Sequence, residues 1–168
     1  AITNVPNTLG AGGTNYVGGD LGNLLNGFIY GGNPETLTLN NLTAGQTYSL
    51  ALYNRSWSGP GGRTQTISTT GGASTTFDQD FNAAGNLNIL RYTFTATGTS
   101  EAINFANTGA SFHFYGFATE QTFNNTRSTG GNWTDAAWSV AQPNGVGSNA
   151  DFTAQGSPTS INLDANRT

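Results

Sequence analysis

Residues 42–53 read LTAGQTYSLALY, and this stretch decides the fold class. From Thr47 to Tyr53 large apolar side chains alternate with small ones, so that Tyr48, Leu50 and Leu52 fall on one face and Ser49 and Ala51 on the other. A period of two residues is that of a β-strand with one buried face. The stretch therefore predicts a strand of an antiparallel sheet that packs one face on a core and leaves the other to water.

The same alternation recurs over residues 90–96, LRYTFTA, with Leu90, Tyr92, Phe94 and Ala96 on one face. We expect weaker strands at residues 25–30, 36–39, 64–68, 75–81 and 102–105. Residues 111–119, SFHFYGFAT, are apolar on both faces, which is typical of a central strand. Glycine pairs interrupt the chain too often for a long helix. Eight short strands predict an all-β antiparallel β-sandwich, jelly-roll-like, over residues 1–121.

Residues 42–48, LTAGQTY, resemble the tyrosine corner of fibronectin type III and related sandwiches. The resemblance implies that Leu42 fills the core, that Gly45 takes the turn and that the Tyr48 hydroxyl bonds back to upstream backbone. Fibronectin connectivity itself is not expected, because some seventy residues of strand-like sequence follow.

The composition excludes several classes of protein. The net charge is −4, only 8% of the residues are charged and none is Lys, so the chain is unsuited to binding nucleic acid. The absence of Cys excludes zinc fingers, thiol nucleophiles and disulfides, and no apolar run is long enough to span a membrane. Ten Phe, six Tyr and three Trp supply a core. With so few titrating groups, we expect the free energy of unfolding to vary little across neutral pH.

After residue 121 the residue pattern changes. Residues 122–131 read as a polar linker, and residues 132–168 as a C-terminal β-segment that docks on the sandwich or on a neighbouring chain. Trp133, Trp138, Pro143 and residues 150–152 (ADF) resemble the opening coil of bacterial autotransporter-associated β-strand repeat proteins. The resemblance implies a secreted or surface-anchored parent protein with a β-solenoid. Because a lone coil cannot bury its apolar face, we expect Trp133, Trp138, Phe152, Ile161 and Leu163 to serve docking or self-assembly.

The most pocket-like feature is the loop of residues 55–63, RSWSGPGGR, where Trp57 stands between two Arg. An aromatic face beside fixed donors suits a neutral sugar, so Trp57, Arg55 and Arg63 are candidate ligand-binding residues. The alternative is that Trp57 plugs the end of the sandwich while Arg55 and Arg63 pair with nearby Asp. Asp78 and Asp80 lie on one face of a strand and are candidates for binding calcium; otherwise no cofactor is expected.

The sequence holds no catalytic constellation. His113 is its sole His and is expected to be structural, and no pair of its nine carboxylates stands in a recognisable context. The chain has no Met, as expected of a processed product whose signal segment is gone. We therefore expect a non-catalytic, secreted or cell-surface structural and adhesive module, forming a homo-oligomer or filament; the alternative is a carbohydrate-binding module that uses the Trp57 loop.

Overall fold

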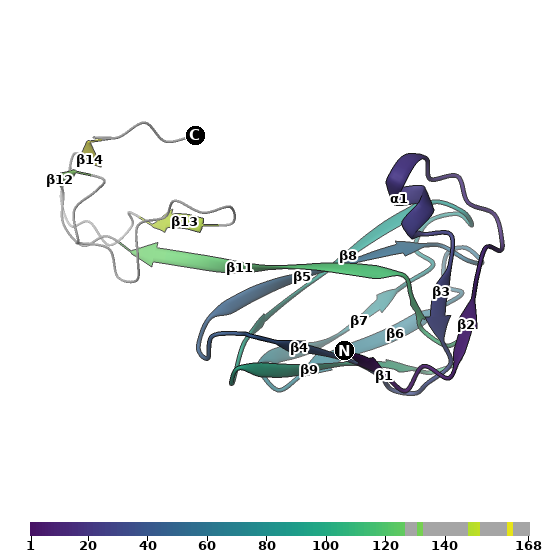
Figure 1. The fold of residues 1–168 in the computed structure, drawn as a ribbon, viewed down its shortest axis with the longest axis horizontal. Coiled ribbons are helices and arrows are strands. Elements are labelled where there is room, and N and C mark those ends of the chain that lie inside the picture. The colour runs from purple at the N-terminus through teal and green to yellow at the C-terminus, as the bar shows by residue number, and fades with distance from the viewer. Residues whose placement is uncertain (127–130, 133–147, 152–160, 163–168) are drawn as a thin grey trace. The chain divides into compact units, whose positions relative to one another are not determined.

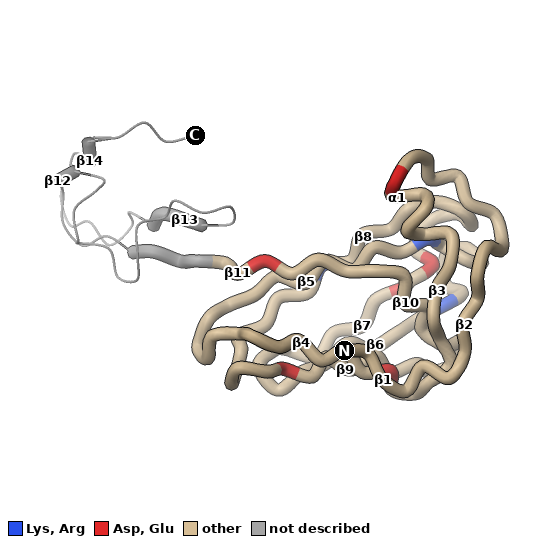
Figure 2. Tube along the Cα trace, viewed as in Figure 1, with Lys and Arg blue, Asp and Glu red and all other residues tan. Residues whose placement is uncertain are grey.

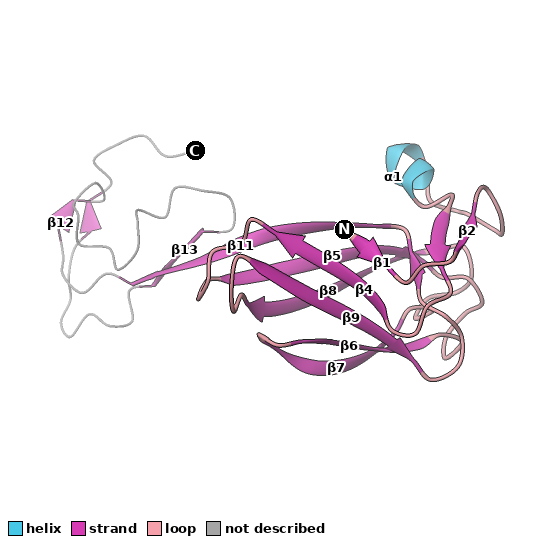
Figure 3. Ribbon diagram, turned by 60° about the horizontal axis from the view of Figure 1, so that its bottom comes forward, coloured by secondary structure: helices cyan, strands magenta, loops and turns pink. Residues whose placement is uncertain are grey.

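The structure is a computed structural model and describes residues 1–126, 131–132, 148–151 and 161–162. It is nearly all β, with 51% strand and 5% helix, and so confirms the predicted all-β fold (Figure 3). The chain forms two compact units, residues 1–119 and 120–168. Its one helix among these residues, α1 (Gly19–Leu24), is too short to cross a membrane, and none of the described residues forms a membrane-spanning helix.

Two main sheets and a smaller one build the first unit (Figure 1). One sheet has five strands in the order β1 (Ile2–Thr3), β4 (Glu35–Asn40), β9 (Ser100–Asn107), β6 (Thr64–Thr69), β7 (Gly72–Asp78). In the second sheet, β11 (Gly116–Thr126), β5 (Thr47–Arg55) and β8 (Leu87–Thr95) are neighbours in that order. The third contains β10 (His113–Phe114), β3 (Phe28–Tyr30) and β2 (Asn7–Leu9). The chain thus passes repeatedly from one sheet to the other.

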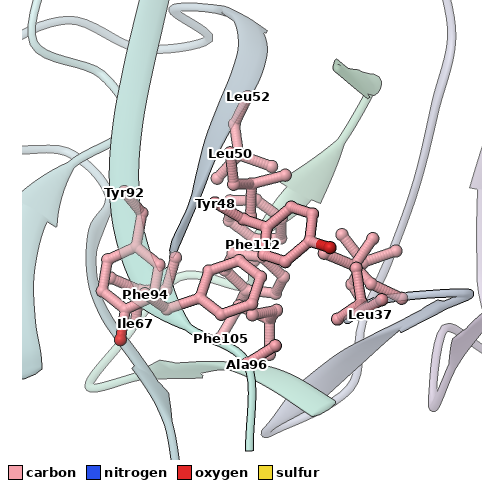
Figure 4. Packing of buried hydrophobic residues seen from close by; sticks show 13 residues of the cluster. Leu37, Tyr48, Leu50, Leu52, Ile67, Tyr92, Phe94, Ala96, Phe105 and Phe112 are labelled. Carbon is pink, nitrogen blue, oxygen red and sulfur yellow. The ribbon is translucent and has the colours of Figure 1, made fainter. Parts of the chain in front are cut away.

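The core lies between the two main sheets (Figure 4). The second sheet supplies the residues that the alternation singled out, Tyr48, Leu50, Leu52, Tyr92 and Phe94, which are all buried. Strands β5 and β8 are antiparallel over nine residue pairs, from Thr47↔Thr95 to Arg55↔Leu87. The five-stranded sheet contributes Leu37, Ile67, Ile103 and Phe105. Burial of these apolar faces is the main driving force for the sandwich.

The tyrosine corner is present as predicted. The Tyr48 hydroxyl accepts a hydrogen bond from the backbone N–H of Thr43 at 2.9 Å, and Leu42 is buried in the core. Gly45 has a φ of 79°, a left-handed conformation that glycine adopts without steric cost. The corner fixes how the chain enters β5.

Several boundaries differ from the prediction. The stretch 111–119 is two strands rather than one central strand, because the chain leaves β10 and turns through Tyr115 into β11. Only residues 28–30 of the expected strand 25–30 are extended, since Leu25 ends α1. The expected strand 75–81 ends at Asp78, whose carboxylate starts a turn by accepting the N–H of Asp80. Strands β1 and β2 are too short for the alternation to predict.

Residues 120–168 are described in part. Strand β11 continues to Thr126, through residues that the sequence indicated as linker. Beyond it lie three short strands, β12 (Gly131–Asn132), β13 (Ser148–Asp151) and β14 (Ile161–Asn162). Both ladders of this unit are parallel: Phe123–Thr126 of β11 pair with β13, and β12 pairs with β14.

Candidate functional site: the loop end of the sandwich

Three loops meet at one end of the first unit: residues 10–17, 56–62 and 79–86, here called the loop end. Backbone hydrogen bonds tie them together. The N–H of Tyr16 donates to the carbonyl of Gly85 at 2.9 Å, and the N–H of Gly85 donates to the carbonyl of Ser56 at 2.8 Å. The N–H of Ser56 donates in turn to Asn86 at 2.9 Å. Because each loop bonds to another, they are held as one body.

Arg55 holds the first loop from inside the protein. Its side chain is 1% exposed, and its guanidinium donates to the carbonyls of Gly12 at 2.7 Å and Thr14 at 2.8 Å. The same group lies over the ring of Trp57 at 5.6 Å, within cation–π distance. Burying a guanidinium costs free energy unless its donors find acceptors, and here backbone carbonyls of this chain accept from Nη1 and Nη2, while the buried Nε has no partner among the described residues. Arg55 is therefore an anchor of the loop end.

Asp80 holds the second loop. Its fully buried carboxylate accepts the N–H groups of Trp57 at 2.6 Å and Ser58 at 3.2 Å. It also forms an ion pair with Arg63, with 3.7 Å between Nε and Oδ2. Burial lowers the pKa of the Arg63 guanidinium, and the negative charge of Asp80 opposes this shift. Arg63 itself donates to the carbonyl of Ser111. Arg55 and Arg63, which were predicted to donate to a ligand, are thus both buried and donate to groups of this protein instead.

The carboxylates proposed for calcium have the same structural task. Asp78 accepts the N–H of Gly61 and of Asp80, the latter at 2.9 Å, and so shapes the turn that leads into the 79–86 loop. The bonds of Asp80 are those given above. Within the described part of the chain no three His, Asp or Glu side chains gather as a metal site would require. The carboxylate oxygens that Asp78 and Asp80 would offer to a cation already accept backbone N–H groups.

Trp57 packs on an aromatic cluster that fills the loop end. Its ring is half-buried and meets the rings of Phe28 and His113 edge-on, with centroids 5.3 and 5.4 Å away. The His113 ring stacks on Phe28 at 3.8 Å. Burial, helped by the nearby charges of Arg63 and Arg55, lowers the pKa of His113 to about 3, so the imidazole is neutral. This packing agrees with the plug that the sequence offered as the alternative for Trp57.

Two aromatic residues that the sequence did not single out are exposed at the loop end. Tyr16 is 72% and Phe81 68% exposed, the highest values among the large apolar side chains of the described residues. Phe81 was expected at the end of a strand, but it lies beyond β7 in the 79–86 loop. The signal that would have identified it is its position between Asp80 and Asn82, two residue types that favour turns.

Two hollows lie elsewhere on the first unit. A slot of about 130 Å³ opens between the two main sheets beside Ile67, Phe77 and Leu90, with Thr75 and Arg91 among its lining residues. A shallow depression of about 440 Å³ lies on the three-stranded sheet around Leu9, Ile29 and Phe114. Neither holds a group of ionisable side chains.

The predicted docking residues fall in the second unit. Ile161 belongs to β14, where it pairs with Gly131. Trp133, Trp138, Phe152 and Leu163 lie outside the described residues. Their part in docking or assembly stays a prediction.

Comparison with known proteins gives weak similarities of fold. The sequence matches no protein-family model and no curated protein. Among solved structures, the C-terminal domain of the sugar-binding protein EclA is 18% identical with a TM-score of 0.38; the match covers 51% of this chain and 64% of that one. The β-glucuronidase 2 of Bacteroides uniformis is 15% identical with a TM-score of 0.49, over 68% of this chain and 13% of the enzyme. This chain thus spans less than two thirds of either protein, and neither similarity identifies its function.

Proposed function

We propose that this chain is a non-catalytic, extracellular structural and adhesive β-module of a bacterial cell-surface protein, and that it associates with further copies of itself. The observation that carries the proposal is that charged side chains of the first unit hold its own loops and turns in place. Figure 2 shows how few charged positions the first unit has. Arg55, Arg63 and Asp80 are buried as anchors of loops, and the carboxylate of Glu101 likewise accepts bonds from Thr69, Gly71 and Thr97. Such use of charge suits a scaffold.

The side of the sandwich where β7 and β8 are the outermost strands supports self-association. Strands β7 and β8 end their sheets in the first unit, and the two sheets are joined there by Thr95 N–H to Gly71 O at 2.8 Å and Tyr92 hydroxyl to Ala73 O at 3.0 Å. Farther along these strands lies the apolar slot of about 130 Å³. Apart from these two bonds, β7 has no further partner strand on this side among the described residues, and an unpaired strand edge is a template for another chain.

Strand β7 has only one of the features that usually protect such an edge, a register shift against β6 between Ile67↔Thr75 and Thr69↔Gly72. Its sequence, GASTTFD, carries no charge before Asp78 and no proline, and residues 73–76 are exposed. Natural edge strands are commonly protected by Lys, Pro or bulges that prevent pairing. An extended segment of a second copy that pairs here would place an apolar side chain in the slot. We therefore take β7 and the slot as the surface for self-association.

The parallel ladders of the second unit agree with the proposed kinship to autotransporter-associated repeat proteins. Strand β11 pairs with β13, and β12 with β14, in the parallel sense that successive coils of a β-solenoid use. The pairs Phe123↔Ser148 and Gly131↔Ile161 are separated along the chain by about the 20–45 residues of a solenoid repeat. This pairing supports a surface location. A carbohydrate site built from Trp57, Arg55 and Arg63 has less support, because both guanidinium groups are buried.

Sedimentation velocity of the full chain over a wide range of concentrations tests the self-association. We expect oligomers for the wild type and monomers for Thr75→Lys, which adds a charge to the exposed β7 edge. Ala102→Lys is the matched control, since it adds the same charge to an exposed position of the central strand β9. A wild type that stays monomeric, or a Thr75→Lys variant that assembles like the control, would contradict the proposal.

A further inference from the structure

We infer that Tyr16 and Phe81 form a binding surface for a neutral carbohydrate at the loop end. The inference rests on the adhesive part of the proposed function and names what the module adheres to. It differs from the sequence-derived alternative, in which Trp57 and its two Arg neighbours would bind the sugar.

The two rings belong to loop positions that lie close together. Phe81 lies in the 79–86 loop, and the Tyr16 ring contacts Gly85 of that loop, where an added Cβ would lie 2.8 Å from the ring. Four residues span at most about 14 Å even when fully extended. One oligosaccharide of a few units is therefore long enough to touch both rings.

Exposure of these rings has no structural benefit. Full burial of a large apolar side chain stabilises a protein by roughly 1.5–3 kcal/mol, and this contribution is largely missing for rings that are 72% and 68% exposed. The other aromatic residue of the loop end, Trp57, is packed on Phe28 and His113. At the loop end the Trp57 ring is thus packed as a plug, while the Tyr16 and Phe81 rings are exposed to solvent.

The rings are held ready for a ligand. Tyr16 is fixed by the bond of its N–H to Gly85, and its loop is fixed by the bonds of Arg55 to Gly12 and Thr14. Phe81 directly follows Asp80, whose carboxylate is buried and takes two backbone N–H groups. Binding to loops that are already ordered costs little conformational entropy.

The chemistry around the rings selects a neutral, hydroxyl-rich ligand. Asp80 of the loop end and the flanking Arg55 and Arg63 are buried, and the flanking Asp78 is half-buried. The exposed residues of the loop end include Thr14, Ser58 and Asn86. An aromatic face packs on the apolar C–H face of a sugar ring, and hydroxyl and amide groups exchange hydrogen bonds with its hydroxyls. An anionic ligand finds no exposed cation among these side chains. A neutral hexose oligosaccharide fits all of these features.

The test uses the full chain and an array of neutral hexose oligosaccharides that also carries sulfated and sialylated ones. Titration calorimetry with the best soluble neutral oligosaccharide then gives the affinity of each variant. We expect wild-type binding to neutral oligosaccharides and an affinity about tenfold lower for Tyr16→Ala and for Phe81→Ala. Phe81→Tyr keeps a ring and should keep binding. Phe117→Ala removes a 40% exposed ring from β11 and should leave the affinity unchanged.

Thermal melting of each variant checks that the fold is intact. The inference is overturned if the wild type binds no neutral oligosaccharide, if it binds only the anionic ones, or if the Tyr16→Ala, Phe81→Ala double variant binds like the wild type. Self-association is measured on a different residue, Thr75. Oligomers without carbohydrate binding would therefore refute this inference alone, and carbohydrate binding by a monomer would refute the self-association alone.

Discussion

The side chain of Gln79 pairs with the backbone of His113 as a neighbouring strand would. Its Oε1 accepts the N–H of His113 at 2.9 Å, and its Nε2 donates to the carbonyl of the same residue. The second N–H of Nε2 donates to Asn54 Oδ1 at 2.6 Å. Through these bonds a single fully buried amide joins the 79–86 loop to β10 and β5.

This amide makes Gln79 a sensitive position. We expect Gln79→Glu to lower the free energy of unfolding by about 3 kcal/mol, because a carboxylate cannot donate and two buried acceptors lose their partner. Urea denaturation at neutral pH measures the change. Gln46→Glu, at the half-buried turn before β5, is the matched control and should cost less than about 0.5 kcal/mol. Equal effects of the two substitutions would show that the Gln79 bonds contribute nothing.

Two buried groups give opposite contributions to the pH dependence of stability. Burial raises the pKa of Glu35 from 4.5 to about 7, although the N–H groups of Gly31 and Gly32 oppose the shift. The folded state then holds a proton that the unfolded state has lost, so this group makes stability fall as the pH rises from 4.5 to about 7. For His113 the pKa falls from 6.5 to about 3, so stability rises with pH over that window.

Between pH 4.5 and 6.5 the two contributions cancel, so the wild type should vary little there. The sequence led us to expect little variation across neutral pH because titrating groups are few; over pH 4.5 to 6.5 the structure gives a different reason. In Glu35→Gln the free energy of unfolding should rise with pH, because only the contribution of His113 remains. In His113→Gln it should fall with pH, because only the contribution of Glu35 remains. Each change should amount to up to about 3 kcal/mol. Denaturation midpoints measured from pH 4 to 8 check this. Parallel profiles for the wild type and both variants would refute the assignment.

The tyrosine corner should contribute measurably to stability. Tyr48→Phe removes the acceptor of the Thr43 N–H and is expected to lower the free energy of unfolding by about 1 kcal/mol. Tyr53→Phe, on the same strand, removes a hydroxyl for which the described residues provide no hydrogen bond. Thermal denaturation of the two variants compares them directly. If Tyr53→Phe costs as much as Tyr48→Phe, the corner is not the cause.

Calcium should leave the stability of the module unchanged. The carboxylates of Asp78 and Asp80 already accept backbone N–H groups, and Asp80 also faces Arg63. A cation would have to displace these partners. We therefore expect equal melting temperatures with calcium and with a chelator. A calcium-dependent rise that Asp78→Asn abolishes would instead establish the site that the sequence suggested.

The strands that the sequence predicted best are those with a clear alternation of large and small or polar side chains. The core-facing residues Leu50, Leu52, Tyr92 and Phe94 are all buried as the alternation predicts. The opposite face is exposed to water in β8 but not in β5, where Ala51 is buried as well. The pattern failed at residues 111–119, because a stretch apolar on both sides carries no information on where a strand breaks. The tyrosine corner was readable because its residues are all within seven positions of one another.

By itself, the sequence determined the all-β class, the tyrosine corner and the shortage of charge, since these depend on local periodicity and composition. Only the tertiary structure decided what the few charges do. Arg55 reaches carbonyls some forty residues away, and Asp80 the N–H groups of the 56–62 loop. Such partners are set by how the loops come together. For the same reason the sequence singled out Trp57 and left open whether it plugs the sandwich or meets a ligand, whereas the fold buries half of it and exposes Tyr16 and Phe81.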